Sequence, residues 1–303
     1  MKKIDIHTHL IGNICGIGSQ GELRPIGEGC AQYASGKIIR LIPEGFGDYQ
    51  LTPETLIKLM KEHEVVHTVC LQGNYVGFQN LYTNEAMKKY PEFITGAATY
   101  DPYFINKHLI IENLFDHLKF KIIKIEASNG SGLMANHDTI DLNGNVMHEV
   151  YKMANERNLI FFYDIGRPGN NCYQIDNLVE VIKQYPNMKF VICHLTAPQH
   201  KQFDLLKENL IKLNYDNVYF DIAALPNNTK MPYPFIEAQE YIKLACDIVG
   251  SNKIMWGSDF PSAMNYCTYK EAYSYIENSN LLTQEEKENI LYNNAYKLLF
   301  GNE

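Results

Sequence analysis

The stretch Lys3-Ile4-Asp5-Ile6-His7-Thr8-His9 places two histidines one residue apart at the start of the chain. Its alternating apolar residues predict a β-strand, in which successive side chains point to opposite faces. Asp5, His7 and His9 would then share one face of the strand. Two neutral imidazoles at this spacing can bind one divalent metal ion. The alternative is a strand end whose polar residues face solvent.

Length and composition set limits on the class of protein. The chain has 303 residues, of which 46% are hydrophobic, and a net charge of −8. These values are typical of a globular protein with a substantial core, and the acidic balance argues against a broad nucleic-acid surface. The 7 cysteines are dispersed without a C-x-x-C pair, so neither a disulfide framework nor a structural zinc site is predicted. We expect reduced thiols, a cytoplasmic location and no membrane span.

Strand-like and helix-like segments alternate along the rest of the chain. The further strand-like runs lie at residues 65–71, 93–100, 121–126, 159–164, 189–194, 217–222 and 253–256. They are apolar on both faces, which is typical of parallel strands covered by helices. This alternation, without a linker, predicts one α/β domain over residues 1–303, a single distorted (β/α)8 TIM barrel. A long loop is expected at about residues 10–51.

Polar residues stand where several of these strands end, and barrel enzymes build their active sites there. His7, His9, His194 and Asp259 offer nitrogen and oxygen donors suited to one catalytic divalent ion. A carboxylate near such an ion could take a proton from water. Each residue also has a simpler explanation, such as a turn-forming aspartate at 259. The strand-end residues are His9, Glu126, Asp164, His194 and Asp259.

Five segments, in order along the whole chain, resemble the amidohydrolase superfamily, in the branch of aminocarboxymuconate-semialdehyde decarboxylase and its relatives. This resemblance implies a distorted (β/α)8 barrel and a mononuclear, usually zinc, site. It also implies hydrolysis or non-oxidative decarboxylation of a small carboxylated compound, with hydration as a variant, and the wider superfamily includes metal-independent lactonases. The segments are Asp5-Ile6-His7-Thr8-His9, Met60-Lys61-Glu62-His63-Glu64-Val65-Val66, Val191-Ile192-Cys193-His194-Leu195, Met255-Trp256-Gly257-Ser258-Asp259-Phe260-Pro261 and Asn294-Ala295-Tyr296-Lys297-Leu298-Leu299-Phe300.

One departure from that family concerns strand five, where the family typically carries a histidine ligand. Here the place reads Phe162-Tyr163-Asp164-Ile165-Gly166, and Asp164 aligns with the histidine by spacing. Aspartate can bind a divalent ion, with a preference shifted toward harder ions such as Mn. Alternatively, the metal is weak or absent and the protein works without it.

These observations assign expected roles. The resemblance and the donor set predict one divalent ion, zinc or alternatively manganese, held by His7, His9, Asp164 and Asp259. Asp259 is expected to act as the base for water, and His194 to stabilise the developing oxyanion or the substrate carbonyl. The expected reaction is hydrolysis, with decarboxylation or hydration as the runner-up.

Substrate recognition is expected from charged residues near the same strand ends. Only 4 of the 27 basic residues are arginines. Arg167, Arg24 and Arg40 lie in candidate loops and could bind a carboxylate in bidentate fashion. Lys124 and Glu126 share a strand face and could orient substrate or form an internal ion pair. We expect a small-molecule substrate, no nucleic acid and no membrane, and we leave homo-oligomer formation open.

Overall fold

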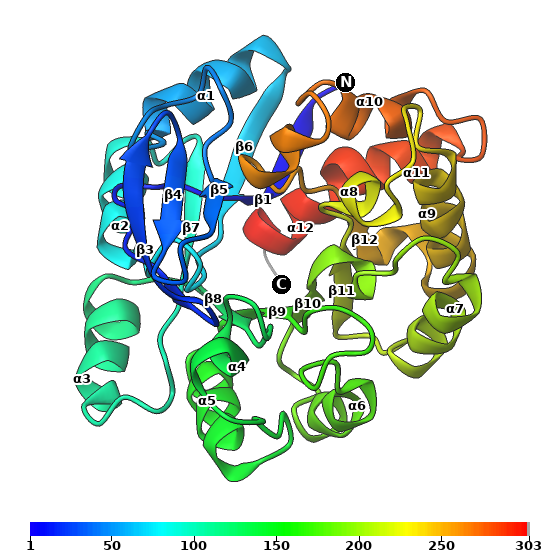
Figure 1. Ribbon diagram of the computed structural model, residues 1–303. Helices are drawn as coiled ribbons and strands as arrows, with labels where there is room; N and C mark the ends of the chain where they lie inside the picture. Colours follow the sequence, from blue (N-terminus) through cyan, green and yellow to red (C-terminus); the bar gives the residue numbers. More distant parts are fainter. Residues whose placement is uncertain (302–303) are drawn as a thin grey trace.

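A computed structural model describes residues 1–301 of the chain. Eight parallel strands form one sheet in the order β1-β6-β7-β8-β9-β10-β11-β12, with helices around the outside (Figure 1). The predicted (β/α)8 barrel is therefore confirmed. The strands are β1 (Lys3–Thr8), β6 (Val65–Cys70), β7 (Ile94–Ala98), β8 (Ile122–Glu126), β9 (Ile160–Asp164), β10 (Phe190–Ile192), β11 (Val218–Asp221) and β12 (Ile254–Met255).

The first and last strands meet through backbone hydrogen bonds. The amide of Ile6 donates to the Trp256 carbonyl at 3.1 Å, and the amide of Asp259 donates to the His7 carbonyl at 2.9 Å. The amide of His9 then donates to the Phe260 carbonyl at 2.7 Å. These bonds close the ring, and they bring the two ends of the sequence side by side where the expected site residues lie.

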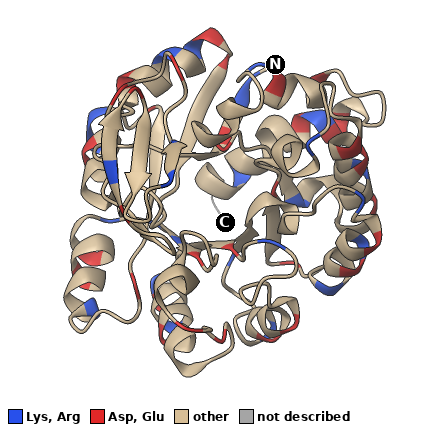
Figure 2. Ribbon diagram, viewed as in Figure 1, with Lys and Arg blue, Asp and Glu red and all other residues tan. Residues whose placement is uncertain are grey.

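Amphipathic helices follow most strands and cover the barrel. In α1 (Pro53–Glu62) the Thr52 hydroxyl caps the helix by accepting the Thr55 amide, and Leu56, Leu59 and Met60 are buried. Charged residues of both signs are interspersed over the outer helices (Figure 2). Among residues 1–301, no helix is both long and apolar enough to cross a membrane. The other major helices are α2 (Asn80–Lys89), α3 (Lys107–Ile111), α5 (Asn145–Glu156), α6 (Ile175–Gln184), α7 (Phe203–Lys212), α9 (Ile236–Val249), α10 (Glu271–Glu277), α11 (Gln284–Glu288) and α12 (Asn294–Phe300).

The inside of the barrel is apolar. One buried cluster combines residues from the strands with Ala295 and Leu298 of α12, which packs beneath the ring. A larger cluster lies between the strands and the outer helices. The inner cluster contains the strand residues Ile4, Ile6, Val69, Ala97, Ile122, Phe162, Val191 and Met255, together with Leu71 and Cys193, which directly follow β6 and β10.

The expectation that about residues 10–51 form a loop was wrong, because the segment has regular secondary structure. This segment contains a four-stranded antiparallel sheet of β2 (Ile17–Gly18), β3 (Gly21–Gly27), β4 (Cys30–Tyr33) and β5 (Ile38–Arg40). Its strands are short and are separated by turns with glycines at positive φ. The glycine-rich sequence of the segment therefore resembles that of a loop. The Ser19 amide donates to the Gly130 carbonyl at 3.1 Å, which ties the sheet to the loop after β8.

Candidate functional site

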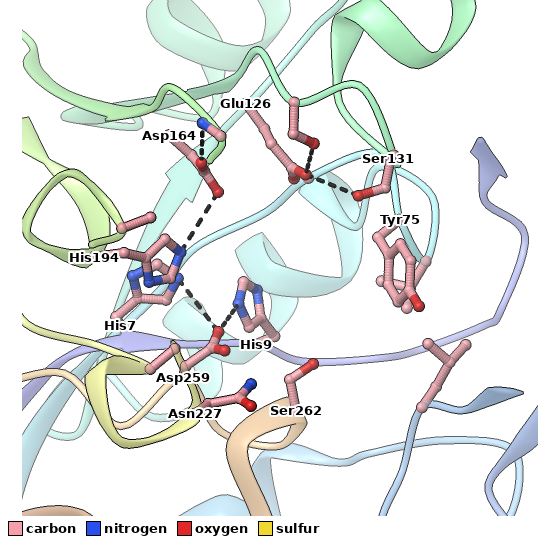
Figure 3. Close-up of a pocket in the computed structure, with 18 of the residues that line it drawn as sticks. His7, His9, Tyr75, Glu126, Ser131, Asp164, His194, Asn227, Asp259 and Ser262 are labelled. Atoms are coloured by element: carbon pink, nitrogen blue, oxygen red, sulfur yellow. Dashed lines mark hydrogen bonds and ion pairs between the residues drawn. The ribbon is translucent and has the colours of Figure 1, made fainter. Parts of the chain in front are cut away.

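A cavity of about 750 Å³ opens at the C-terminal ends of the barrel strands. Figure 3 shows side chains from β1, from the last residues of β8 and β9 and from the segments after β10, β11 and β12 pointing into this space. Ile39, Arg40 and Leu41 add a wall from the small sheet and the residue that follows it. Most residues predicted from strand ends line the cavity, namely His7, His9, Lys124, Glu126, Asp164, His194 and Asp259.

His7 and His9 converge on one carboxylate oxygen. Asp259 Oδ1 lies 3.6 Å from His7 Nε2 and 3.2 Å from His9 Nε2 (Figure 3). The other nitrogen of His9, Nδ1, faces the Leu71 carbonyl at 3.0 Å. Because a carbonyl only accepts hydrogen bonds, this contact places a proton on His9 Nδ1, and Nε2 is the nitrogen that faces Asp259 and the cavity.

The backbone around Asp259 is shaped by Asp5. Asp259 has φ of 58°, a left-handed conformation in a non-glycine residue. Asp5 Oδ1 accepts the amides of His7 and Ser258 at 3.2 and 2.9 Å, and Asp5 Oδ2 accepts the Tyr269 hydroxyl at 2.7 Å. Asp5 therefore braces the turn from behind.

Asp5 does not line the cavity that His7 and His9 line. The pairing of β1 with β6 has a register irregularity between Asp5 and Thr8. Burial raises the pKa of the Asp5 carboxyl to about 6, against the hydrogen bonds from Ser258 and Tyr269.

Sequence reasoning missed Asp221, at the end of β11. Its side chain is fully buried, and Oδ2 lies 3.0 Å from His7 Nδ1. Burial lowers the pKa of His7, and the nearby Asp221 carboxylate partly opposes this effect. Burial alone would raise the pKa of Asp221, but His7 and His194 lower it to about 2. The signal that could have found this residue is its position at a strand end, as for Asp164.

His194 lies in an unusual turn directly after β10. Four consecutive non-glycine residues, His194 to Ala197, have positive φ values of 59°, 51°, 64° and 52°. Left-handed backbone costs about 1 kcal/mol or more for each such residue, so surrounding contacts must hold the turn. His194 Nδ1 faces the Ala223 carbonyl at 3.0 Å and the ring lies with its centroid 4.8 Å from that of His7.

Asp164 contacts His194, with 3.5 Å between Asp164 Oδ2 and His194 Nε2. Burial alone would lower the pKa of His194, but Asp164, with Asp221 and Asp259 nearby, raises it to about 10. Burial would likewise raise the pKa of Asp164, and His194 and Lys124 instead hold it well below its usual value. At neutral pH the pair is therefore an imidazolium and a carboxylate.

Lys124 and Glu126 form an ion pair on the cavity wall, with 3.3 Å between Lys124 Nζ and Glu126 Oε2. Burial would lower the pKa of Lys124, but Glu126 and Asp164 raise it. Glu126 Oε1 also accepts the hydroxyls of Ser128 and Ser131 at 2.7 and 2.9 Å (Figure 3). Because both residues line the cavity, Lys124 and Glu126 can pair with each other and also contact a substrate.

The three candidate arginines occupy different places. Arg167 and Arg40 both line the cavity, from the loop after β9 and from β5 respectively. One Arg40 guanidinium nitrogen donates to the Glu28 carbonyl at 2.6 Å, which steadies it at the mouth. Arg24, on β3, is exposed and is not among the residues that line the cavity. Two of the three can therefore reach a ligand there.

The donor set fits a divalent ion. The ligand atoms of His7, His9 and Asp259 all lie within 4.8 Å of one another. Two imidazole nitrogens and a carboxylate oxygen face one another, a donor set that suits a divalent cation. Ligands of a tetrahedral zinc with bonds of about 2.1 Å are about 3.4 Å apart, close to the two distances to Asp259 Oδ1. His7, His194 and Asp221 form a second group within the same limit, while Asp164 faces His194.

Solved structures with similar folds come from several bacteria. A probable 2-pyrone-4,6-dicarboxylic acid hydrolase from Acinetobacter baumannii, with citric acid bound, is 18% identical with a TM-score of 0.71, covering 98% of this chain and 99% of that chain. An amidohydrolase from Burkholderia multivorans with bound zinc is 13% identical with a TM-score of 0.73, covering 98% of both chains. A 5-carboxyvanillate decarboxylase from Sphingomonas paucimobilis is 12% identical with a TM-score of 0.56, covering 80% of this chain and 81% of that chain.

Because their sequence identities are low, these neighbours support the fold and nothing more specific. No curated protein sequence is similar enough to count as a relative. The sequence model of the family described as Amidohydrolase matches residues 4–301, almost the whole chain. The resemblance seen in the five sequence segments is thereby confirmed, and the chain belongs to the amidohydrolase family.

Proposed function

We propose that the protein is a metal-dependent hydrolase of a small carboxylated compound. The observation that supports this proposal best is the meeting of His7 Nε2 and His9 Nε2 at Asp259 Oδ1, 3.6 and 3.2 Å away. His7, His9 and Asp259 would hold the ion. Asp164, expected as a further ligand, faces His194, so we assign it first to that pair.

The ion, when bound, would supply Lewis acidity toward water and the substrate carbonyl. The chain's own residues handle the protons. The Asp259 carboxylate takes a proton from the attacking water as the water oxygen bonds to the carbonyl carbon, and it returns that proton to the leaving oxygen. The positively charged His194, paired with Asp164, stabilises the oxygen that gains negative charge through its electrostatic field.

A carboxylate on the substrate suits the mouth of the cavity. Arg167 and Arg40 line it, and guanidinium binds carboxylate in bidentate geometry. One structural neighbour is named as a probable 2-pyrone-4,6-dicarboxylic acid hydrolase and was solved with citric acid. 2-Pyrone-4,6-dicarboxylic acid and citric acid both carry several carboxyl groups, and the pyrone is also a cyclic ester. A carboxylated lactone is therefore the substrate class that we propose.

A second candidate is hydrolysis of the same class of compound without a metal. The observation that favours it is the His194–Asp164 pair, at 3.5 Å, on the strand where the family typically has a histidine ligand. A pKa of about 10 for His194 puts a fixed positive charge in the cavity. That charge could polarise a carbonyl with no ion present.

The test is an assay of carboxylated lactones, esters and aromatic acids with purified protein, before and after chelation and after return of Zn²⁺ or Mn²⁺. Incorporation of ¹⁸O from labelled water into the product identifies hydrolysis, and release of carbon dioxide identifies decarboxylation. We expect hydrolysis that is lost on chelation and restored by metal. Full activity after chelation would favour the second candidate, and carbon dioxide without labelled product would overturn both.

A matched pair of variants accompanies the assay. His9→Asn should abolish metal-restored hydrolysis because it removes one imidazole from the donor set. His117→Asn makes the same change at a histidine whose side chain is 65% exposed, and it should leave hydrolysis unchanged.

A further inference from the structure

We infer that Asp221 is a positioning residue that sets the tautomer of His7 and holds the backbone of the His194 turn. Only its catalytic consequences rest on the proposed function. Asp221 is not among the residues that line the cavity. It would therefore act through the two histidines, without touching the substrate.

The first contact concerns His7. Asp221 Oδ2 lies 3.0 Å from His7 Nδ1, and the two side chains are 0% and 1% exposed. An ionised carboxylate only accepts hydrogen bonds, so this contact requires a proton on His7 Nδ1. In the neutral ring, Nε2 then presents a lone pair toward Asp259 Oδ1, 3.6 Å away. With the opposite tautomer, His7 Nε2 could not bind a cation.

The second contact concerns His194. Asp221 Oδ1 accepts the backbone amides of His194 at 2.9 Å and of Ala223 at 3.0 Å. The Ala223 carbonyl in turn faces His194 Nδ1 at 3.0 Å. One carboxylate oxygen therefore fixes where the left-handed turn begins and, through Ala223, the direction of the His194 ring.

A role as a direct metal ligand is the main alternative, since Asp221 forms a group with His7 and His194 within 4.8 Å. The contacts favour positioning. Both of its carboxylate oxygens already face N–H groups of the chain, two on Oδ1 and one on Oδ2. Asp259, by contrast, lines the open cavity.

Asp221→Asn tests the inference with little change in shape. Asparagine can keep the oxygen that accepts the two amides while its NH2 group replaces Oδ2 beside His7. An NH2 donor requires a lone pair on His7 Nδ1, which moves the proton to Nε2. The measurement is ¹⁵N NMR of histidine-labelled, metal-free protein, with the His7 signals assigned by their loss in His7→Asn.

The matched control is Asp101→Asn. Asp101 also pairs with a histidine, His137, at 2.6 Å, and accepts the Tyr103 amide at 2.9 Å, outside the cavity. The Asp101→Asn variant removes a carboxylate–imidazole contact comparable to the contact between Asp221 and His7. The His7 signals should be identical in this variant and in the wild type.

We expect wild-type His7 to be protonated at Nδ1 and the Asp221→Asn variant to be protonated at Nε2. Zn²⁺ affinity should fall about 10- to 100-fold in the variant, the usual effect of losing such a carboxylate. Wild-type His7 protonated at Nε2, or an unchanged tautomer in Asp221→Asn, would overturn the inference. The wild-type measurement decides even if the variant fails to fold. A wild type that binds no metal and hydrolyses nothing would overturn the proposed function, while the tautomer would still be measured.

Discussion

The two ends of the barrel bury different kinds of residue. Under the ring, α12 fills the interior with Ala295 and Leu298 against apolar strand residues. At the other end, buried histidines and aspartates crowd one cavity (Figure 3). The first arrangement gains stability from apolar burial, and the second costs stability because charged groups are removed from water.

Left-handed residues occur at both ends of the barrel, including Glu64 directly before β6 and Asn158 shortly before β9. The left-handed residues from His194 to Ala197 and at Asp259 all lie at the cavity end. Such residues persist only where surrounding contacts determine the conformation. Asp5 and Asp221 supply those contacts from behind the cavity. The contacts that hold the strained residues of the site therefore come from buried carboxylates next to them.

Asp259→Asn should have the largest effect, on activity. It removes the charge that the two imidazoles face and the group that takes the proton from water. We expect hydrolysis to fall about 10³-fold with little change in the melting temperature. Asp176→Asn, on an aspartate that is 82% exposed, is the control. Equal activity of the two variants would contradict the role of Asp259.

Leu298→Ala should act in the opposite sense, on stability. It leaves a cavity in the apolar cluster beneath the ring, and we expect the free energy of unfolding to fall by about 3 kcal/mol. The activity of the folded protein should be unchanged. Leu281→Ala, at an exposed leucine, should change stability by less than about 1 kcal/mol. Lost activity in folded Leu298→Ala would show that the two ends are not separable. Denaturant unfolding and assay below the melting temperature measure both properties.

Asp5→Asn should change how stability depends on pH. Burial raises the pKa of Asp5 from an ordinary 3.8 to about 6. The folded state therefore binds this proton more tightly, and its contribution is complete below pH 3.8 and lost as pH rises through 6. The stability of wild type minus that of Asp5→Asn should fall by about 2–3 kcal/mol over this window. A difference that does not vary with pH would contradict the burial of a titrating carboxyl.

Arg40→Ala should have the smallest effect. It removes one cation from the mouth of the cavity, and we expect a roughly tenfold rise in KM for a carboxylated substrate, with kcat nearly constant. Arg24→Ala, on the same small sheet but away from the cavity, should leave KM unchanged. Similar KM values for the two variants would show that the sheet does not help to bind substrate.

Much of the architecture could be predicted from sequence because it depends on local patterns. Apolar runs separated by helical segments predict the barrel, and the positions of His7, His9 and Asp259 at strand ends predict that they meet. Asp221 was missed because it lies within an apolar run and carries no motif. The partner of Asp164 could not be foreseen, since it depends on the left-handed turn at His194. Turns of that kind are determined by tertiary contacts.

His7, His9 and Asp259 are expected to hold one cation at the mouth of the barrel. The most direct measurement is the metal content of protein purified without chelator, for the wild type and for the His7→Asn, His9→Asn double variant. We predict about one divalent ion per chain in the wild type and none in the double variant, with both proteins folded. A full complement of metal in the double variant would contradict the assignment of His7 and His9 as ligands.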